Sequence, residues 1–191
     1  MHCKHLWLYI AIIAGLISCK KDKEPPVVPP TENTTIISVH FPPTAPYTFF
    51  NFKSNTVIPN TDSASTKWDF GLRLTSFIVN SNASGPGNAA VILKDGIFDN
   101  VTEAPSQGYA YDTASNKLAV KDGSWYDYNP ATRTFVPKAG KVFIFRTVDN
   151  KYAKMEILEA TYENFVGLTP LKIKYKIRFS YQTDGSLNLR K

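Results

Sequence analysis

The chain has 191 residues and a formal net charge of +6, with 43% hydrophobic and 13% aromatic residues. This length is enough to bury a real core and suits one domain with a short extension. Basic residues do not interleave with aromatic residues in runs, so the positive charge does not indicate a nucleic-acid-binding protein. The high aromatic content favours a core built from β-strands.

Residues 1–18 have the pattern of a secretory signal. A basic start with Lys4 precedes a short apolar run, Leu6 to Ile17, and small residues lead to Cys19. The apolar run is too short to span a membrane as a helix. Because the segment ends on Cys, it resembles a bacterial lipoprotein signal, which implies that Cys19 becomes the lipidated first residue of the mature chain. The alternative is an ordinary signal peptide in which this Cys is incidental.

Residues 19–34 have the composition of a tether. They read CKKDKEPPVVPPTENT, in which the prolines fix φ and favour an extended, polyproline-like backbone. Such a stretch cannot bury apolar area. We therefore expect a semi-rigid stalk that carries a single domain over residues 35–191.

Lipidation would make the membrane a partner of the protein through its N-terminus. Two or more acyl chains hold a protein firmly on a bilayer. No second apolar run reaches spanning length. The expected location is the outer membrane, with the domain exposed to the cell surface or the periplasm. Loss of Cys3 with the signal, and acylation of Cys19, would leave no thiol for a disulfide, catalysis or a metal.

Short segments of strand character follow the tether, and no stretch sustains a helical period. Turn residues separate them, as in the Gly- and Asn-rich stretch 82–88. Early strands are expected over residues 35–41, 47–52, 67–74, 77–80, 89–93 and 124–128.

The clearest strand pattern lies near the C-terminus. Over residues 172–182, Ile, Tyr and Phe alternate strictly with Lys, Arg, Ser and Gln. This period of two predicts one buried face and one wet, cationic face. The Thr183-Asp184-Gly185 turn is expected to lead into a returning segment at 187–189.

A second hairpin is expected between residues 142–147 and 152–158. The connecting Asp149-Asn150 pair tolerates the positive φ of a tight turn. Residues 159–165 suit either a short helix or an extended turn. The sequence as a whole predicts an all-β, antiparallel sheet-rich domain.

Enzyme chemistry is poorly represented. After the signal, His40 is the one histidine, which leaves little material for Ser-His-Asp or Cys-His catalysis. An ordinary zinc site needs several His or Cys ligands and is not expected. Neither a phosphate-binding loop nor a spaced pair of carboxylates stands out. We do not expect an enzyme.

Five segments carry a resemblance to a known family. In chain order they are TKWDFGL (66–72), VNSNASGPG (79–87), WYDYNPAT (125–132), PKAGKVFIFRTVDNKYAK (137–154) and FSYQTDGS (179–186). Together they resemble the HmuY family, the haem-binding surface lipoproteins of anaerobic Gram-negative bacteria. The resemblance implies an all-β fold that holds haem in a cleft between loops, with delivery to or from an outer-membrane receptor.

The chain departs from the paired histidines of the best-known family members. His40 lies before the region of resemblance, and Thr132-Arg133-Thr134 stands where one family histidine would be sought. Met155 and His40 are the candidate iron ligands that remain beside the tyrosines. For Met155 the alternative is a core position, and for His40 it is a solvent-facing one.

Other residues could hold the ring itself. Trp125 and Tyr126 are candidates to flank a flat ring by stacking, although both could equally pack in the core. Arg133 is a candidate partner for haem propionates, or a solvated cation. A slot with two facing donor atoms is expected near the Trp125 and Gly85 loops.

These observations favour a lipid-anchored surface protein that binds haem or a related tetrapyrrole for uptake. Such a protein needs only a dry slot, flanking aromatic rings and a few cations. The alternative is a surface adhesion or nutrient-capture module without haem binding, which the missing histidine pair supports.

Overall fold

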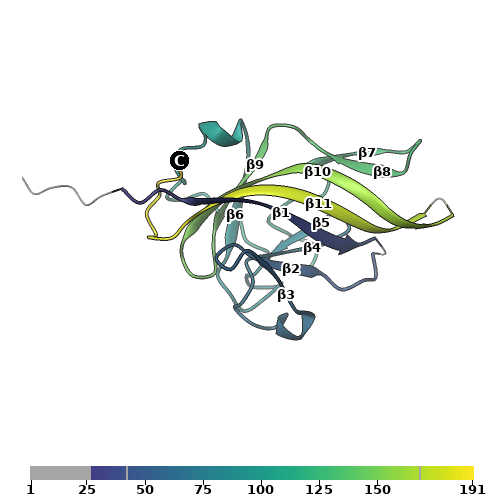
Figure 1. The fold of residues 1–191 in the computed structure, drawn as a ribbon. Helices are drawn as coiled ribbons and strands as arrows, with labels where there is room; N and C mark the ends of the chain where they lie inside the picture. Colours follow the sequence, from purple (N-terminus) through teal and green to yellow (C-terminus); the bar gives the residue numbers. More distant parts are fainter. Residues whose placement is uncertain (1–26, 42, 168) are drawn as a thin grey trace, which may run out of the picture.

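The structure, a computed structural model, describes residues 27–41, 43–167 and 169–191 and consists mainly of antiparallel strands (Figure 1). The all-β prediction is therefore confirmed. The signal segment and Cys19 lie outside the described residues. Within the described ranges, no helix is long and apolar enough to cross a membrane.

Most strands belong to two sheets whose inner faces form a common core. Sheet A contains, in spatial order, β1 (Thr31–His40), β11 (Thr169–Gln182), β10 (Tyr152–Val166), β9 (Lys141–Arg146) and β6 (Ala90–Asp95). Sheet B contains β3 (Thr56–Ile58), β2 (Thr48–Asn51), β4 (Phe70–Arg73) and β5 (Ser76–Val79). A separate hairpin pairs β7 (Tyr126–Asn129) with β8 (Thr134–Pro137). Two 3-10 turns, η1 (Asn60–Asp62) and η2 (Phe98–Asn100), complete the secondary structure of the described residues.

The strand expectations agree with the structure in most places. Strands β1, β2, β4, β5, β6 and β7 overlap the six early ranges, and β9 pairs with β10 as expected. Strand β1 begins at Thr31, inside the stretch expected to be a tether, because it pairs with β11 from its first residue. Residues 159–165 form neither a helix nor a turn but continue β10 against β11. The segment 187–189 is not a strand and makes one isolated bridge, between Asn188 and Glu103.

The alternation along β11 places its apolar residues in the core, as predicted. Ile173, Tyr175, Ile177, Phe179 and Tyr181 are all buried. The opposite face is cationic and accessible only in part. Its last two residues, Ser180 and Gln182, are buried as well, and Gln182 donates to the carbonyl groups of Val28 and Asn188. The segments that contain Val28 and Asn188 therefore cover this end of the outer face.

Aromatic rings from both sheets fill the space between them. Phe52 of the segment after β2 lies 4.8 Å from Phe145 of β9, measured between ring centroids, and 5.2 Å from Phe179 of β11. Phe77 of β5 stacks on Phe143 of β9 at 5.0 Å. Each buried ring removes a large apolar area from water, so this cluster is the main source of stability in a domain without a disulfide among its described residues.

A buried carboxylate joins the two sheets. Asp69, which is 1% exposed, accepts hydrogen bonds from the backbone N–H groups of Phe52 (2.8 Å) and Val148 (2.9 Å). Phe52 follows β2 of sheet B, and Val148 lies in the turn between β9 and β10 of sheet A. Burial raises the pKa of Asp69 to about 6, although both backbone donors oppose that rise.

Asn80 organises the Gly-rich loop that follows β5. Its Nδ2 donates to the carbonyl groups of Ser65 (2.9 Å) and Trp68 (2.8 Å), and its Oδ1 accepts from the N–H of Gly87 (2.9 Å). A Cβ atom on Gly85 would lie 2.2 Å from that Oδ1, so only glycine fits there. Asp69, Asn80 and Gly85 belong to the first two segments that carry the family resemblance, and all three thus have structural roles.

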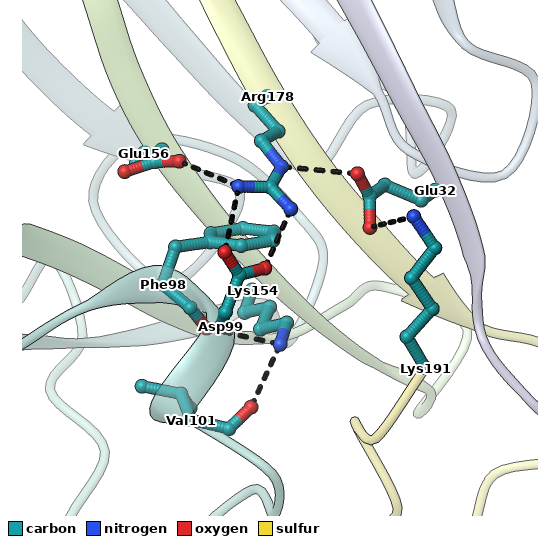
Figure 2. A network of polar contacts seen from close by, with 8 residues as sticks. All are labelled: Glu32, Phe98, Asp99, Val101, Lys154, Glu156, Arg178 and Lys191. Carbon is teal, nitrogen blue, oxygen red and sulfur yellow. Dashed lines mark hydrogen bonds and ion pairs between the residues drawn. The ribbon is translucent and has the colours of Figure 1, made fainter.

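A polar network covers the outer face of sheet A near the chain termini (Figure 2). Lys154 of β10 is 3% exposed, and its ammonium donates to the carbonyl groups of Phe98 (3.0 Å) and Val101 (2.8 Å). The ring of Phe98 is also contacted by Arg178, whose guanidinium carbon lies 4.3 Å from the centroid. Arg178 pairs with Glu32, Asp99 and Glu156. This network fastens η2 to the sheet.

Candidate functional site

A cavity of about 470 Å³ opens between the β7–β8 hairpin and the end of the β10–β11 hairpin. We name it the hairpin slot. Both hairpin turns lie at one end of the molecule, opposite the end where the described chain begins (Figure 1). The slot is lined by Phe41, Tyr126, Tyr128, Arg133, Phe135, Thr169 and Pro170. Its volume and aromatic lining are typical of sites for small organic ligands.

One wall of the hairpin slot consists of aromatic rings from the β7–β8 hairpin. Tyr128 and Phe135 are directly paired across the two strands, so their side chains lie on one face, with ring centroids 5.0 Å apart. Tyr126 meets Phe135 edge to face at 5.2 Å. Although it lines a cavity, the Tyr128 side chain is 51% exposed. Such a half-exposed aromatic surface suits the face of a flat ligand.

The hairpin that carries this wall is held by a tyrosine of sheet A. The hydroxyl of Tyr162 on β10 donates to the carbonyl of Phe135 (2.8 Å) and accepts a hydrogen bond from the N–H of the same residue. At the base of the hairpin, the N–H of Lys138 donates to the carbonyl of Trp125 (2.9 Å). The aromatic wall of the slot is therefore held against sheet A.

Two polar side chains of the slot have different roles. The hydroxyl of Tyr126 donates to the carboxylate of Asp122. Burial raises the pKa of Tyr126, and the Asp122 hydrogen bond raises it further, so the side chain remains a phenol. Arg133 stands in the β7–β8 turn with a φ of 55° and is exposed. It supplies a positive charge at the slot that could meet a ligand carboxylate.

The structure brings two of the five predicted haem-site residues together in the hairpin slot, Tyr126 and Arg133. Trp125 is buried behind them, in edge-to-face contact with Tyr126 at 5.1 Å, and so does not offer a face to a ligand. Met155 is 0% exposed between the two sheets, where it fills the core. His40 is exposed at the end of β1, outside the slot lining.

A slot was expected near the Trp125 and Gly85 loops, but the Gly85 loop does not border the hairpin slot. Gly85 lines a different cavity of about 610 Å³ on the outer face of sheet B, together with Tyr47 and Arg73. Packing explains the difference: Gly85 is held against Trp68, which precedes β4, and Asn80, which follows β5, whereas Trp125 packs on Tyr175 of sheet A.

Four of the lining residues were not among the candidates: Phe41, Phe135, Thr169 and Pro170. Tyr128 was covered only by the mention of the tyrosines as a group. A usable signal was present in the sequence, because Tyr126 and Tyr128 alternate with Asp127 and Asn129, which places both rings on one face of a strand. The missing information was the second strand, residues 134–137, which pairs with this segment.

No group of three or more His, Cys, Asp or Glu side chains is arranged to hold a metal ion within residues 27–41, 43–167 and 169–191. The hairpin slot is a cavity of aromatic and cationic character. No group in it is arranged as a nucleophile with a general base.

Comparison with known proteins places this geometry in a family context. The family model described as HmuY protein matches residues 44–181. No curated protein is significantly similar to the chain.

Similar solved structures share the fold at low sequence identity. The apo HmuY analogue TFO of Tannerella forsythia is 14% identical, with a TM-score of 0.52 over 80% of this chain and 98% of that chain. Apo PinO from Porphyromonas gingivitis is 11% identical, with a TM-score of 0.50 over 80% of this chain and 99% of that chain. A Bacteroides vulgatus protein, provisionally described as an HmuY-like haem-binding protein, is 15% identical, with a TM-score of 0.47 over 76% and 90%.

Proposed function

The chain belongs to the HmuY family, and on that premise we propose that it binds haem or a related tetrapyrrole in the hairpin slot for uptake. The family is non-enzymatic, and its members bind haem. The observation that supports the proposal is the wall formed by Tyr126, Tyr128 and Phe135 in a cavity of ligand size. A flat, hydrophobic ring with carboxylates at its edge matches this wall and the nearby Arg133.

The proposal includes attachment to the outer membrane through lipid on Cys19, with a receptor in that membrane as the onward partner. The supporting features are the lipoprotein-type signal and the proline-rich stretch that follows it. The β7–β8 and β10–β11 hairpin turns, which border the slot, lie at the end of the molecule away from the point where the described chain begins (Figure 1). A tethered protein of this shape would present the slot away from its anchor.

Haemin titration of the detergent-solubilised full-length protein tests the binding proposal. Binding should shift the Soret band and saturate at one haemin per protein. Tyr128→Ala and Phe135→Ala should each weaken binding, because each removes part of the aromatic wall. No Soret shift in either redox state would contradict haem binding and would favour the adhesion or nutrient-capture alternative.

Metabolic labelling tests the anchor separately. Cells that express the chain should incorporate labelled palmitate into it, and Cys19→Ala should abolish the label and release the protein from the membrane fraction. A labelled Cys19→Ala protein would contradict lipidation at this residue.

A further inference from the structure

The hairpin slot offers aromatic faces and one cation but no imidazole, thioether or thiol. Its lining residues are Phe, Tyr, Pro, Thr and Arg. Axial ligands of haem iron in proteins are His, Met, Cys or Tyr side chains. The described residues contain one histidine, one methionine and no cysteine, so the position of each donor can be checked individually.

His40 lies on the opposite face of sheet A from the residues that border the slot. Along β1, Ile37 and Val39 point into the core between the sheets, and Phe41 packs against that same core. Because successive side chains of a strand alternate, His40 points outward, where it is paired with Lys172 of β11. Its imidazole therefore points away from the face on which Phe41 lines the slot, and it is not part of the slot lining.

Met155 cannot reach the slot without unpacking the core. It is paired with Phe143 on one side and with Phe179 on the other, in the centre of sheet A. Its side chain is fully buried in the main hydrophobic cluster. Moving this side chain out to the slot would leave a cavity in the close-packed core.

Phenol oxygens are the remaining donors in the slot. The Tyr126 hydroxyl donates a hydrogen bond to Asp122, and burial raises the pKa of Tyr126. The phenolate form that would bind iron is therefore disfavoured. Tyr128 presents its ring to the slot beside Phe135. Its hydroxyl is therefore the phenol oxygen of the slot that remains to be tested as an iron ligand.

We infer that the hairpin slot recognises a tetrapyrrole through its flat ring and its carboxylates, and not through the metal at its centre. This inference rests on the proposed function, because it specifies which chemical groups of the ligand the slot contacts. The aromatic wall contacts the ring face, and Arg133 meets a carboxylate. Metal-free and metal-containing porphyrins are then equivalent ligands.

Parallel titrations with haemin, zinc protoporphyrin and metal-free protoporphyrin test this inference on the full-length protein in detergent. Quenching of tryptophan fluorescence provides one readout for all three ligands. The dissociation constant of haemin should be no more than about tenfold lower than that of metal-free protoporphyrin. A larger preference for haemin would overturn the inference, and binding of none of the three would overturn the proposed function itself.

A matched pair of variants tests the remaining oxygen donor. Tyr128→Phe keeps the ring and should leave the affinities for haemin and metal-free protoporphyrin unchanged. Tyr128→Ala should weaken both by about three- to tenfold, because aromatic stacking contributes on the order of 0.5–1.5 kcal/mol. Loss of haemin binding alone in Tyr128→Phe would identify a tyrosinate ligand and overturn the inference.

Discussion

The hydroxyl of Tyr162 bonds both backbone groups of Phe135, donating to its carbonyl and accepting from its N–H. Tyr162 belongs to β10 of sheet A, whereas Phe135 belongs to β8 of the separate hairpin. One side chain thus takes the place of a neighbouring strand and holds the aromatic wall of the hairpin slot against the sheet. The affinity of the slot should depend on this contact, although Tyr162 does not line the slot.

Tyr162→Phe should loosen the hairpin. The substitution removes both hydrogen bonds and leaves the N–H and C=O of Phe135 without this partner, at a cost of roughly 1–3 kcal/mol. Urea unfolding should show the loss of stability, and porphyrin titration should show weaker binding. Tyr109→Phe is the matched control, since Tyr109 lies outside the slot lining and its hydroxyl has no hydrogen-bond partner among the described residues. Equal affinities of wild type and Tyr162→Phe would contradict this role.

Asp69 should make stability depend on pH in the acidic range. Its pKa is raised by burial from 3.8 to about 6, so the folded protein holds a proton that the unfolded chain has lost. The resulting contribution is fully present below pH 3.8 and is lost as the pH rises through about 6. A shift of two units corresponds to about 3 kcal/mol.

Asp69→Asn should abolish this contribution and should also destabilise the protein at neutral pH. Both carboxylate oxygens accept backbone N–H groups, whereas asparagine would point its own N–H₂ at one of them. Urea unfolding between pH 4 and 8 measures the effect as a wild-type-minus-variant difference that shrinks as the pH rises. Asp127→Asn, at an exposed position on β7, is the control. A constant difference across this range would show that Asp69 does not titrate there.

Lys154→Met should destabilise the fold without affecting the hairpin slot. The methionine fills a similar volume but leaves the carbonyl groups of Phe98 and Val101 without the ammonium that they bind, at a cost of roughly 1–3 kcal/mol. Lys176→Met changes an exposed lysine of the neighbouring strand and should be nearly neutral. Similar unfolding midpoints for the two variants would contradict a structural role for the buried ammonium.

Gly85→Ala should lower stability because the new Cβ would lie 2.2 Å from Oδ1 of Asn80 and 2.7 Å from Cζ2 of Trp68. Overpacking of this kind costs roughly 1–3 kcal/mol. Thermal unfolding provides the measurement, and Pro86→Ala at the exposed neighbouring position is the control. An unchanged melting temperature for Gly85→Ala would mean that the loop can move away from Asn80.

Arg133→Gln should weaken porphyrin binding by roughly two- to fivefold, the value of an exposed ion pair. The loss should disappear with protoporphyrin dimethyl ester, which has no carboxylate to pair with the guanidinium. Titration of both ligands against wild type and Arg133→Gln separates the charge from the ring. A loss of the same size with the ester would show that Arg133 contributes through packing and not through its charge.

The segments that carried the family resemblance prove to be mostly structural. Asp69 joins the sheets, Asn80 and Gly85 fix a loop, and Lys154 fastens η2. These roles depend on backbone geometry that tolerates few alternatives, which explains why their pattern could be recognised without a ligand-binding motif. The residues that line the hairpin slot lie partly outside those segments. A resemblance carried by structural residues therefore does not reveal them.

The sequence by itself determined the class of fold, the β9–β10 hairpin and the buried face of β11, because turn chemistry and strand alternation are local properties of the chain. It also predicted that Tyr126 and Arg133 belong to the site. Only the tertiary structure decided that Met155 lies in the core, that His40 points away and that Phe41 meets the β7–β8 hairpin. Those outcomes depend on which strands become neighbours in the folded protein. Proximity between segments far apart in the chain leaves no periodic signal in a single sequence.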